Sequence, residues 1–113
     1  MTIGYTNFFA PAVLTTAAVT LATVPATPFG TILRGGRIRF TNTTAVAAAV
    51  TAYAVPPAGT AGVGNAFVSA KSIAANDFLD VDVPIMPAGA FLQALASANT
   101  SITAHMLGGG LFS

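Results

Sequence analysis

The sequence lacks cysteine and tryptophan, and it has very few charged side chains. Without cysteine, the chain can form no disulfide, zinc–cysteine site, iron–sulfur cluster or thiol nucleophile. Its 113 residues include four Lys or Arg, three Asp and no Glu, so 6% are charged, against about 25% in an ordinary soluble domain. The net charge of +1 gives little long-range field, so binding to nucleic acid or to a membrane surface is not expected.

The residues that are abundant are apolar or small: 54% of the chain is hydrophobic, and it contains 24 alanines and 15 threonines. Low charge combined with broad apolar surface promotes association. We therefore expect a subunit of a larger assembly. The most apolar uncharged stretch, residues 8–24, contains Pro11 and four threonines and has no flanking basic residue, so neither a membrane-spanning helix nor a secretory leader is predicted.

Hydrophobic alternation predicts strands in most windows. In residues 37–41, Ile38 and Phe40 fall on one face and two arginines on the other, as in a half-buried strand. Residues 90–97 have helical propensity but are too short for a stable isolated helix, so a strand is preferred there. The predicted strands are Thr15–Val24, Thr31–Arg34, Arg37–Thr41, Val46–Val55, Ala66–Ala74, Asp77–Val83, Ala90–Ser97 and Ser101–Leu107. This spacing predicts an all-β fold: a single antiparallel, jelly-roll-like β-sandwich of seven or eight short strands over residues 1–113.

Proline and glycine mark the connections between these strands. Residues 56–65 are predicted to be the longest loop and residues 42–44 a turn, while Gly35–Gly36 indicates a bulge or a hairpin. Gly108–Gly110 is predicted to be a flexible or tight turn. Within 66–74, alternation predicts one face formed by Phe67, Ser69, Lys71 and Ile73. Within 46–55, it predicts Val46, Ala48, Val50, Ala52 and Ala54 on one face and Thr51, Tyr53 and Val55 on the other.

The two ends of the chain are apolar but have no regular period. Residues 1–11 include Tyr5, Phe8 and Phe9, and they are predicted either to form an N-terminal arm over a neighbour or to make a local strand. Residues 108–113 are expected to be a flexible or partner-bound end, because Leu111 and Phe112 are apolar and require a partner.

The sequence offers little catalytic chemistry. His105 is the single histidine, no phosphate-binding or nucleophile motif occurs, and no base stands near the hydroxyl groups. No catalytic residue, metal site or cofactor is predicted, and the chain is not expected to be an enzyme. Asp77, Asp80 and Asp82 fall within six positions and suggest calcium at first sight, but no calcium-binding loop motif surrounds them.

The charged residues form two sequence clusters of opposite sign. Arg34, Arg37 and Arg39 are predicted to form one basic strand face, and Asp80 and Asp82 face water on another strand. Two interpretations remain open. The clusters either pair across strands within one subunit or align separate subunits, where like charges also reject wrong docking.

From Thr31 to about Ala104, the order of features resembles small virion proteins of tailed bacteriophages. The residues that carry the resemblance are Arg-Ile-Arg-Phe-Thr-Asn-Thr-Thr at 37–44, Tyr-Ala-Val-Pro at 53–56 before the Gly-rich loop, Lys-Ser-Ile-Ala at 71–74, and Ala-Gly at 88–89 before 91–97. The chain differs in having unusually few acidic residues. The resemblance implies a non-enzymatic β-sandwich protein that decorates or cements a capsid, binding the major capsid protein and copies of itself. It also implies location on the capsid exterior after assembly in the host cytoplasm.

Two other functions remain as alternatives, namely a tail, neck or fibre protein of a phage particle and a secreted carbohydrate-binding β-sandwich. The second is disfavoured because stacking on sugars needs aromatic side chains, and the chain has no Trp and two Tyr. The residues predicted to contact other subunits or the capsid are Tyr5, Phe8, Phe9, Arg34, Arg37, Arg39, Asp80, Asp82, Leu111 and Phe112.

Overall fold

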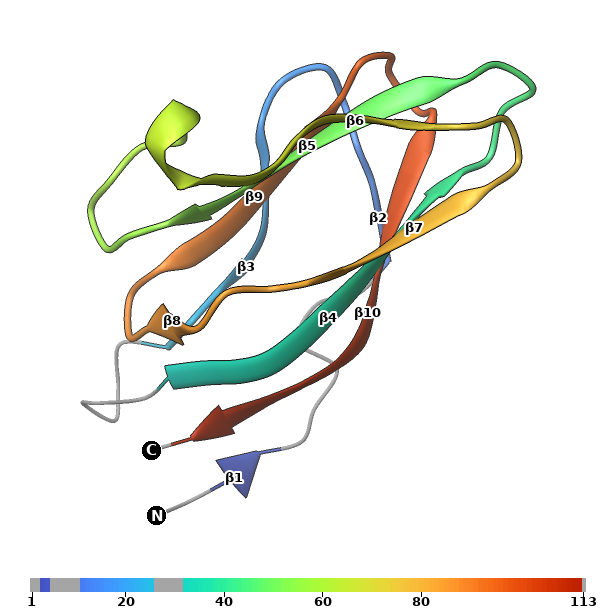
Figure 1. The fold of residues 1–113 in the computed structure, drawn as a ribbon. Helices are drawn as coiled ribbons and strands as arrows, with labels where there is room; N and C mark the ends of the chain where they lie inside the picture. The colour runs from blue at the N-terminus through green and yellow to red at the C-terminus, as the bar shows by residue number, and fades with distance from the viewer. Residues whose placement is uncertain (1–2, 5–10, 26–31, 113) are drawn as a thin grey trace.

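The computed structural model describes residues 3–4, 11–25 and 32–112, which form ten β-strands and one turn of 3-10 helix (Figure 1). The elements are β1 Ile3–Gly4, β2 Ala12–Val13, β3 Val19–Thr23, β4 Ile32–Asn42, β5 Ala48–Val55, η1 Val63–Asn65, β6 Ala66–Ile73, β7 Phe78–Asp82, β8 Met86–Pro87, β9 Phe91–Ala96 and β10 Ile102–Phe112. Seven of the strands have five or more residues. The predicted all-β fold is confirmed.

The strands form two antiparallel sheets that face each other as a sandwich (Figure 1). The six-stranded sheet has the order β1-β10-β4-β7, with β2 also paired to β10 and β8 to β4. The four-stranded sheet has the order β3-β9-β5-β6. Strands β5 and β6 are consecutive in one sheet, whereas β4 to β5, β6 to β7, β8 to β9 and β9 to β10 pass from one sheet to the other. The predicted antiparallel β-sandwich is therefore confirmed.

Side chains alternate along β4, which lies between β10 and β7 in the six-stranded sheet. Ile38 and Phe40 are fully buried, while Arg37 is exposed and Arg39 is partly exposed. The predicted two faces of this strand are confirmed. Strand β9 alternates in the same way, with Leu92, Ala94 and Ala96 buried, so the strand preferred over a helix at 90–97 is also confirmed.

The two sheets contribute side chains of different size to the core. From the six-stranded sheet, the largest fully buried side chains are Leu33, Ile38, Phe40, Met86 and Ile102. From the four-stranded sheet, five of the buried residues are alanines: Ala22, Ala48, Ala52, Ala94 and Ala96. The four-stranded sheet also buries five larger residues, Val50, Val55, Val68, Ile73 and Leu92. The buried side chains of the six-stranded sheet are therefore larger on average, and the alanines of the four-stranded sheet leave room for them.

Asn42 ends β4 and is one of two buried polar residues among those described, with a side chain that is 0% exposed. Its Nδ2 donates hydrogen bonds to the carbonyl oxygens of Val46 (2.8 Å) and Ile73 (3.1 Å). Its Oδ1 accepts hydrogen bonds from the Thr44 backbone N–H (3.0 Å) and hydroxyl (2.7 Å). The predicted turn at 42–44 is confirmed, and its first side chain ties β4 to the end of β6 across the sandwich.

The predicted turn at Gly108–Gly110 is wrong, because β10 continues through these glycines to Phe112 while paired with β4. The pairing shifts register on both sides of Gly108, so bulges absorb the irregularity. Gly109 has a φ of +147°, and a Cβ there would lie 2.7 Å from Met106 Cε. Gly35 opposite has a φ of +67°, so the Gly35–Gly36 signal marks a bulge inside β4 and not a hairpin.

A bulge also corrects the predicted face of β6. Val68 and Ile73 are both buried in the core although they are five residues apart, which strict alternation does not allow. Ala70 between them has a φ of +45°, and the pairing with β5 shifts register there. The shift reverses the alternation within β6, so Phe67, Ser69, Lys71 and Ile73 do not share one face.

Two other predicted strands differ in extent. The strand predicted at 15–24 begins only at Val19, and β5 begins at Ala48, so that Val46 lies before it and is 73% exposed. Register shifts within β5 leave Val55 buried and Ala54 half-buried at its end. The segment 56–65 is a loop as predicted, apart from the single turn η1.

Candidate interaction surface

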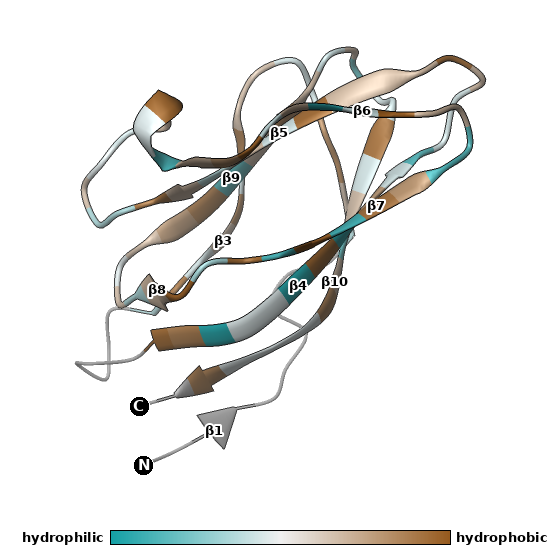
Figure 2. Cartoon of the chain, viewed as in Figure 1, coloured by the Kyte–Doolittle hydropathy of each residue, from teal (hydrophilic) through white to brown (hydrophobic). Residues whose placement is uncertain are grey.

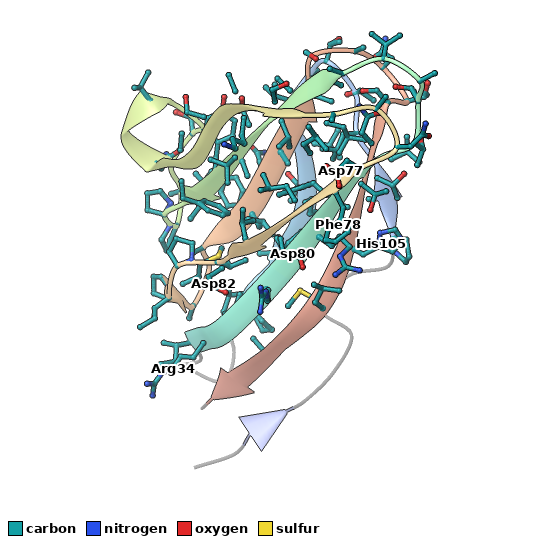
Figure 3. The ribbon with its side chains drawn as sticks, turned by 45° about the vertical axis from the view of Figure 1, so that its right-hand side comes forward. Arg34, Asp77, Phe78, Asp80, Asp82 and His105 are labelled. Atoms are coloured by element: carbon teal, nitrogen blue, oxygen red, sulfur yellow. The ribbon has the colours of Figure 1, made fainter. Side chains whose placement is uncertain are left out.

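The two charged sequence clusters meet on the outer face of the six-stranded sheet. Strands β4 and β7 are neighbours, and their pairing sets Arg37 directly opposite Asp82 and Arg39 directly opposite Asp80. Figure 2 shows hydrophilic bands on β4 and β7, and Figure 3 shows Asp80 and Asp82 in succession along β7. Of the two interpretations left open by the sequence, pairing across strands within one subunit is what the structure shows.

Arg39 and Asp80 form a two-pronged ion pair. Arg39 Nε donates to Asp80 Oδ1 at 2.8 Å, and Arg39 Nη2 donates to Oδ2 at 3.0 Å. The hydrogen bonds from Arg39 hold the pKa of the Asp80 carboxyl below its usual value, and the carboxylate raises the pKa of Arg39 in return. The ring of Phe78 lies 4.1 Å from Arg39 Cζ, measured to its centroid, so the guanidinium is also held by a cation–π contact.

The Arg37–Asp82 pair is much looser. Arg37 Nε lies 4.0 Å from Asp82 Oδ1, and the two side chains are 56% and 90% exposed. An exposed pair at this distance contributes little to stability. Arg37 and Asp82 therefore remain accessible to another molecule, whereas Arg39 and Asp80 already satisfy each other.

The remaining polar residues singled out from the sequence take separate positions. Asp77 Oδ1 accepts a hydrogen bond from the Phe78 backbone N–H at 2.8 Å, so this carboxylate caps its own strand. His105 lies on β10 opposite Arg39 and is half-buried. Arg34 is exposed near the start of β4, and the register shift between it and Arg37 brings both onto the outer face. Among the described residues, no group of three His, Cys, Asp or Glu is arranged to hold a metal ion.

The predicted contacts at the two ends of the chain are only partly described. Ile3 and Gly4 form β1 and pair with Phe112 and Leu111 of β10, so this part of the N-terminus is a local strand. Leu111 is half-buried and packs against the core. Tyr5, Phe8 and Phe9 lie outside the described residues, as does the side chain of Phe112. An arm formed by the N-terminal residues and a partner bound at residues 108–113 both remain predictions.

Four exposed apolar residues of the six-stranded sheet and its connections were not among the predicted contacts: Val13, Phe78, Ile85 and Leu107, which are 52%, 51%, 65% and 46% exposed. Phe78 has the same parity along β7 as Asp80 and Asp82, so the alternation already placed it on the outer face. Val13, Thr103, Thr41 and Phe78 form one cross-strand row over β2, β10, β4 and β7. This row lies beside the row of His105, Arg39 and Asp80.

The outer face of the four-stranded sheet has a different character. Strands β3, β5 and β9 contain no charged residue, and Lys71 on the edge strand β6 is the single one in this sheet. The outward side chains at its centre include Thr51, Tyr53, Gln93 and Leu95, all half-buried. Gln93 Nε2 donates to Thr20 Oγ1 at 2.9 Å. This face presents hydroxyl, amide and apolar groups and no ionic ones.

No protein-family model and no curated protein sequence matches the chain. Solved structures do match it in fold. A chain in the structure of infectious bursal disease virus Gx strain superposes on 97% of this chain with a TM-score of 0.52 and 14% sequence identity. The fold is shared with a viral chain. The Gt strain of the same virus gives a TM-score of 0.49 at 12% identity, and a crystal structure of its VP2 subviral particle gives 0.45 at 14%.

These neighbours are longer than this chain, which spans 31% of the length of the Gx-strain chain. At such low identity the match establishes the β-sandwich fold and nothing finer. In the part of the chain that the structure describes, no helix is both long and apolar enough to cross a membrane.

Proposed function

We propose that this chain is a non-enzymatic structural protein of a virus particle, and that within the particle it decorates and cements the capsid. In this role it sits on the capsid exterior, is assembled in the host cytoplasm, and binds the major capsid protein and copies of itself. The observation that carries the proposal is the superposition of 97% of the chain on a chain of infectious bursal disease virus, with a TM-score of 0.52.

The chemistry of the surface supports a structural role. One ionic pair of β4 and β7 is fully engaged: Arg39 and Asp80 form a two-pronged pair, and the Phe78 ring lies against the guanidinium. This arrangement is suited to a rigid surface.

The uncharged outer face of the four-stranded sheet is the surface we assign to the capsid. Burying Thr51, Tyr53 and Leu95 there desolvates no ionic group, so the hydrophobic gain is not offset by a charge penalty. The apolar N-terminal segment around Phe8 and Phe9 is the proposed second contact. A permanent complex of this kind is expected to bury about 2,000 Å² or more in total.

Mass spectrometry of purified particles tests the proposal, with the copy number measured relative to the major capsid protein. A decoration protein is expected in hundreds of copies, whereas about six or twelve copies indicate a tail or neck station on the particle axis. The chain's absence from particles would contradict any virion role.

A matched pair of variants tests the assigned face. Gln93→Lys places a charge at the centre of the uncharged face, and Thr60→Lys places the same charge in the exposed loop that precedes η1. Binding to capsids that lack the protein is expected to weaken at least tenfold for Gln93→Lys, because a lysine must be desolvated on docking. Thr60→Lys is expected to bind normally, and equal binding by both variants would exclude this face.

A further inference from the structure

The charges on the outer face of the six-stranded sheet are sorted by strand. Arg34, Arg37 and Arg39 lie along β4, and Asp80 and Asp82 lie along its neighbour β7, with two pairs in direct register. Figure 3 shows Asp80 and Asp82 along β7 and Arg34 near the start of β4. The face therefore carries a basic column beside an acidic column.

We propose that this face docks onto the same face of a second copy, about a twofold axis that runs parallel to the strands between β4 and β7. This axis sets β4 of one copy over β7 of the other, and residues that are paired across the two strands keep the same height along them. Arg37 of one copy then faces Asp82 of the second copy, and Asp82 faces Arg37. An axis across the strands sets arginine over arginine, so the charges select a single arrangement.

The groups needed for this contact are accessible. Arg37 and Asp82 are 56% and 90% exposed and lie 4.0 Å apart within the subunit, which leaves each of them able to bond across the interface. Arg39 and Asp80 stay paired within the subunit and hold the centre of the face rigid. Phe78, which is 51% exposed, adds apolar area and faces Thr41 of the second copy.

Two copies of a β-sandwich can also join by pairing their edge strands, and several edges of these sheets disfavour that arrangement. Strand β6 carries a bulge at Ala70 and an edge lysine, Lys71, and β3 shifts register between Thr20 and Ala22. A second β7 beside β7 brings the aspartates of both copies together. Bulges and edge charges of this kind block strand addition at the β3, β6 and β7 edges, so a second copy is not expected to add a strand there.

The contact is small, because the complementary columns are two strands wide. We expect less than about 1,200 Å² of total buried area, which is the range of weak and transient complexes. Association should therefore be visible at high protein concentration and should weaken as salt screens the exchanged ion pairs. This contact is independent of capsid binding, since it uses the opposite face of the sandwich from the one assigned to the capsid.

Sedimentation velocity of the purified full chain at rising concentration, in low and in high salt, measures this association. The wild type is expected to form dimers at low salt and fewer at high salt. Arg37→Asp and Asp82→Arg are each expected to lose self-association at least tenfold, because each sets like charges opposite each other twice. A mixture of the two variants, and the double swap Arg37→Asp with Asp82→Arg, is expected to restore dimers.

Lys71→Asp is the matched control, because it changes the net charge by the same amount as Arg37→Asp but lies on the four-stranded sheet. It is expected to associate as the wild type does, and thermal unfolding checks that every variant is folded. The proposal is overturned if the wild type stays monomeric at low salt, if Lys71→Asp loses dimers equally, or if neither the mixture nor the double swap restores them. Particle stoichiometry is measured separately, so a capsid role stands or fails without this result.

Discussion

The two sheets of the sandwich contribute buried side chains of different size to the core. The six-stranded sheet supplies Phe40, Ile38 and Ile102, all fully buried, whereas β5 and β9 of the four-stranded sheet supply four buried alanines beside Val50, Val55 and Leu92. Alanine buries little area for each residue, so the alanine positions of β5 and β9 depend on the larger side chains that pack opposite them. Strands with many alanines can pack here because the larger side chains of the facing sheet fill the space beside them.

The outer faces differ as sharply as the inner ones. Six of the eight Arg, Lys, Asp and His side chains lie on the outside of the six-stranded sheet, namely Arg34, Arg37, Arg39, Asp80, Asp82 and His105. The three strands β3, β5 and β9 carry none. A small number of charges, gathered on one face, leaves the other face free of any group that is costly to desolvate.

The first prediction removes the largest buried side chain of the six-stranded sheet. Phe40→Ala removes a fully buried ring and is expected to lower the free energy of unfolding by about 3–5 kcal/mol. Phe78→Ala is the matched control on the outer face of the same sheet; its ring is 51% exposed, and a loss of about 1 kcal/mol or less is expected. Urea unfolding followed by circular dichroism measures both, and similar losses would refute the assignment of bulk to the inner face.

The second prediction places a larger side chain on the inner face of the four-stranded sheet. Ala94→Leu adds volume at a position that is 0% exposed between β3 and β5, and it is expected to cost about 1–3 kcal/mol because the large side chains opposite cannot retreat. Gln93→Leu introduces the same residue one position earlier, on the outer face, and is expected to change stability by about 0.5 kcal/mol or less. If Ala94→Leu unfolds at the same urea concentration as the wild type, the core has a cavity beside Ala94 and is not closely packed there.

The comparison also shows how far the sequence predicts this fold. Alternation at 37–41 predicted the buried face of β4, because a regular strand keeps its period of two. At 90–97 the short length predicted the strand β9 without assigning its faces. Alternation failed in β6, where the bulge at Ala70 reverses the faces. An alanine gives no local signal of a left-handed backbone, so the pairing with β5 alone determines that change.

The candidate surface was predictable in its parts but not in its assembly. The two-residue spacing of Arg37 and Arg39, and of Asp80 and Asp82, predicted which way the side chains point. That β4 and β7 are neighbours in register is a long-range fact of sheet order, which no local pattern encodes. Glycines gave a wrong prediction in β10: a turn was expected at Gly108–Gly110, but the strand continues through them paired with β4, and at Gly109 a Cβ would lie 2.7 Å from Met106 Cε.

The third prediction tests the rigid centre of the charged face through pH. Because Arg39 holds the pKa of Asp80 below its ordinary value of 3.8, the pair stabilises the fold fully above that value, and this stabilisation is lost as pH falls through the lower folded pKa. Asp80→Asn is expected to melt a few degrees below the wild type at neutral pH, with the gap closing in acid.

Asp82→Asn is the control for this pH series, since its carboxylate lies 4.0 Å from Arg37 and is 90% exposed. Its melting temperature is expected to stay near that of the wild type at every pH. A gap for Asp80→Asn that persists unchanged in acid would mean that the side chain stabilises the fold through shape and not through its charge.

The smallest predicted effect lies in the connection that passes from the four-stranded to the six-stranded sheet. Thr100 has a φ of +58°, which strains a β-branched residue by about 1–2 kcal/mol. Thr100→Gly relieves this strain and keeps the backbone hydrogen bond to the Leu14 carbonyl (3.1 Å), while glycine adds freedom to the unfolded chain. A net gain of about 0.5 kcal/mol in the free energy of unfolding is expected from urea unfolding.

Thr103→Gly, in β10, is the control and is expected to lose about 1 kcal/mol instead. A loss for both would show that the turn depends on the threonine hydroxyl, which donates to the Asn99 carbonyl at 2.7 Å, more than on the relief of its backbone.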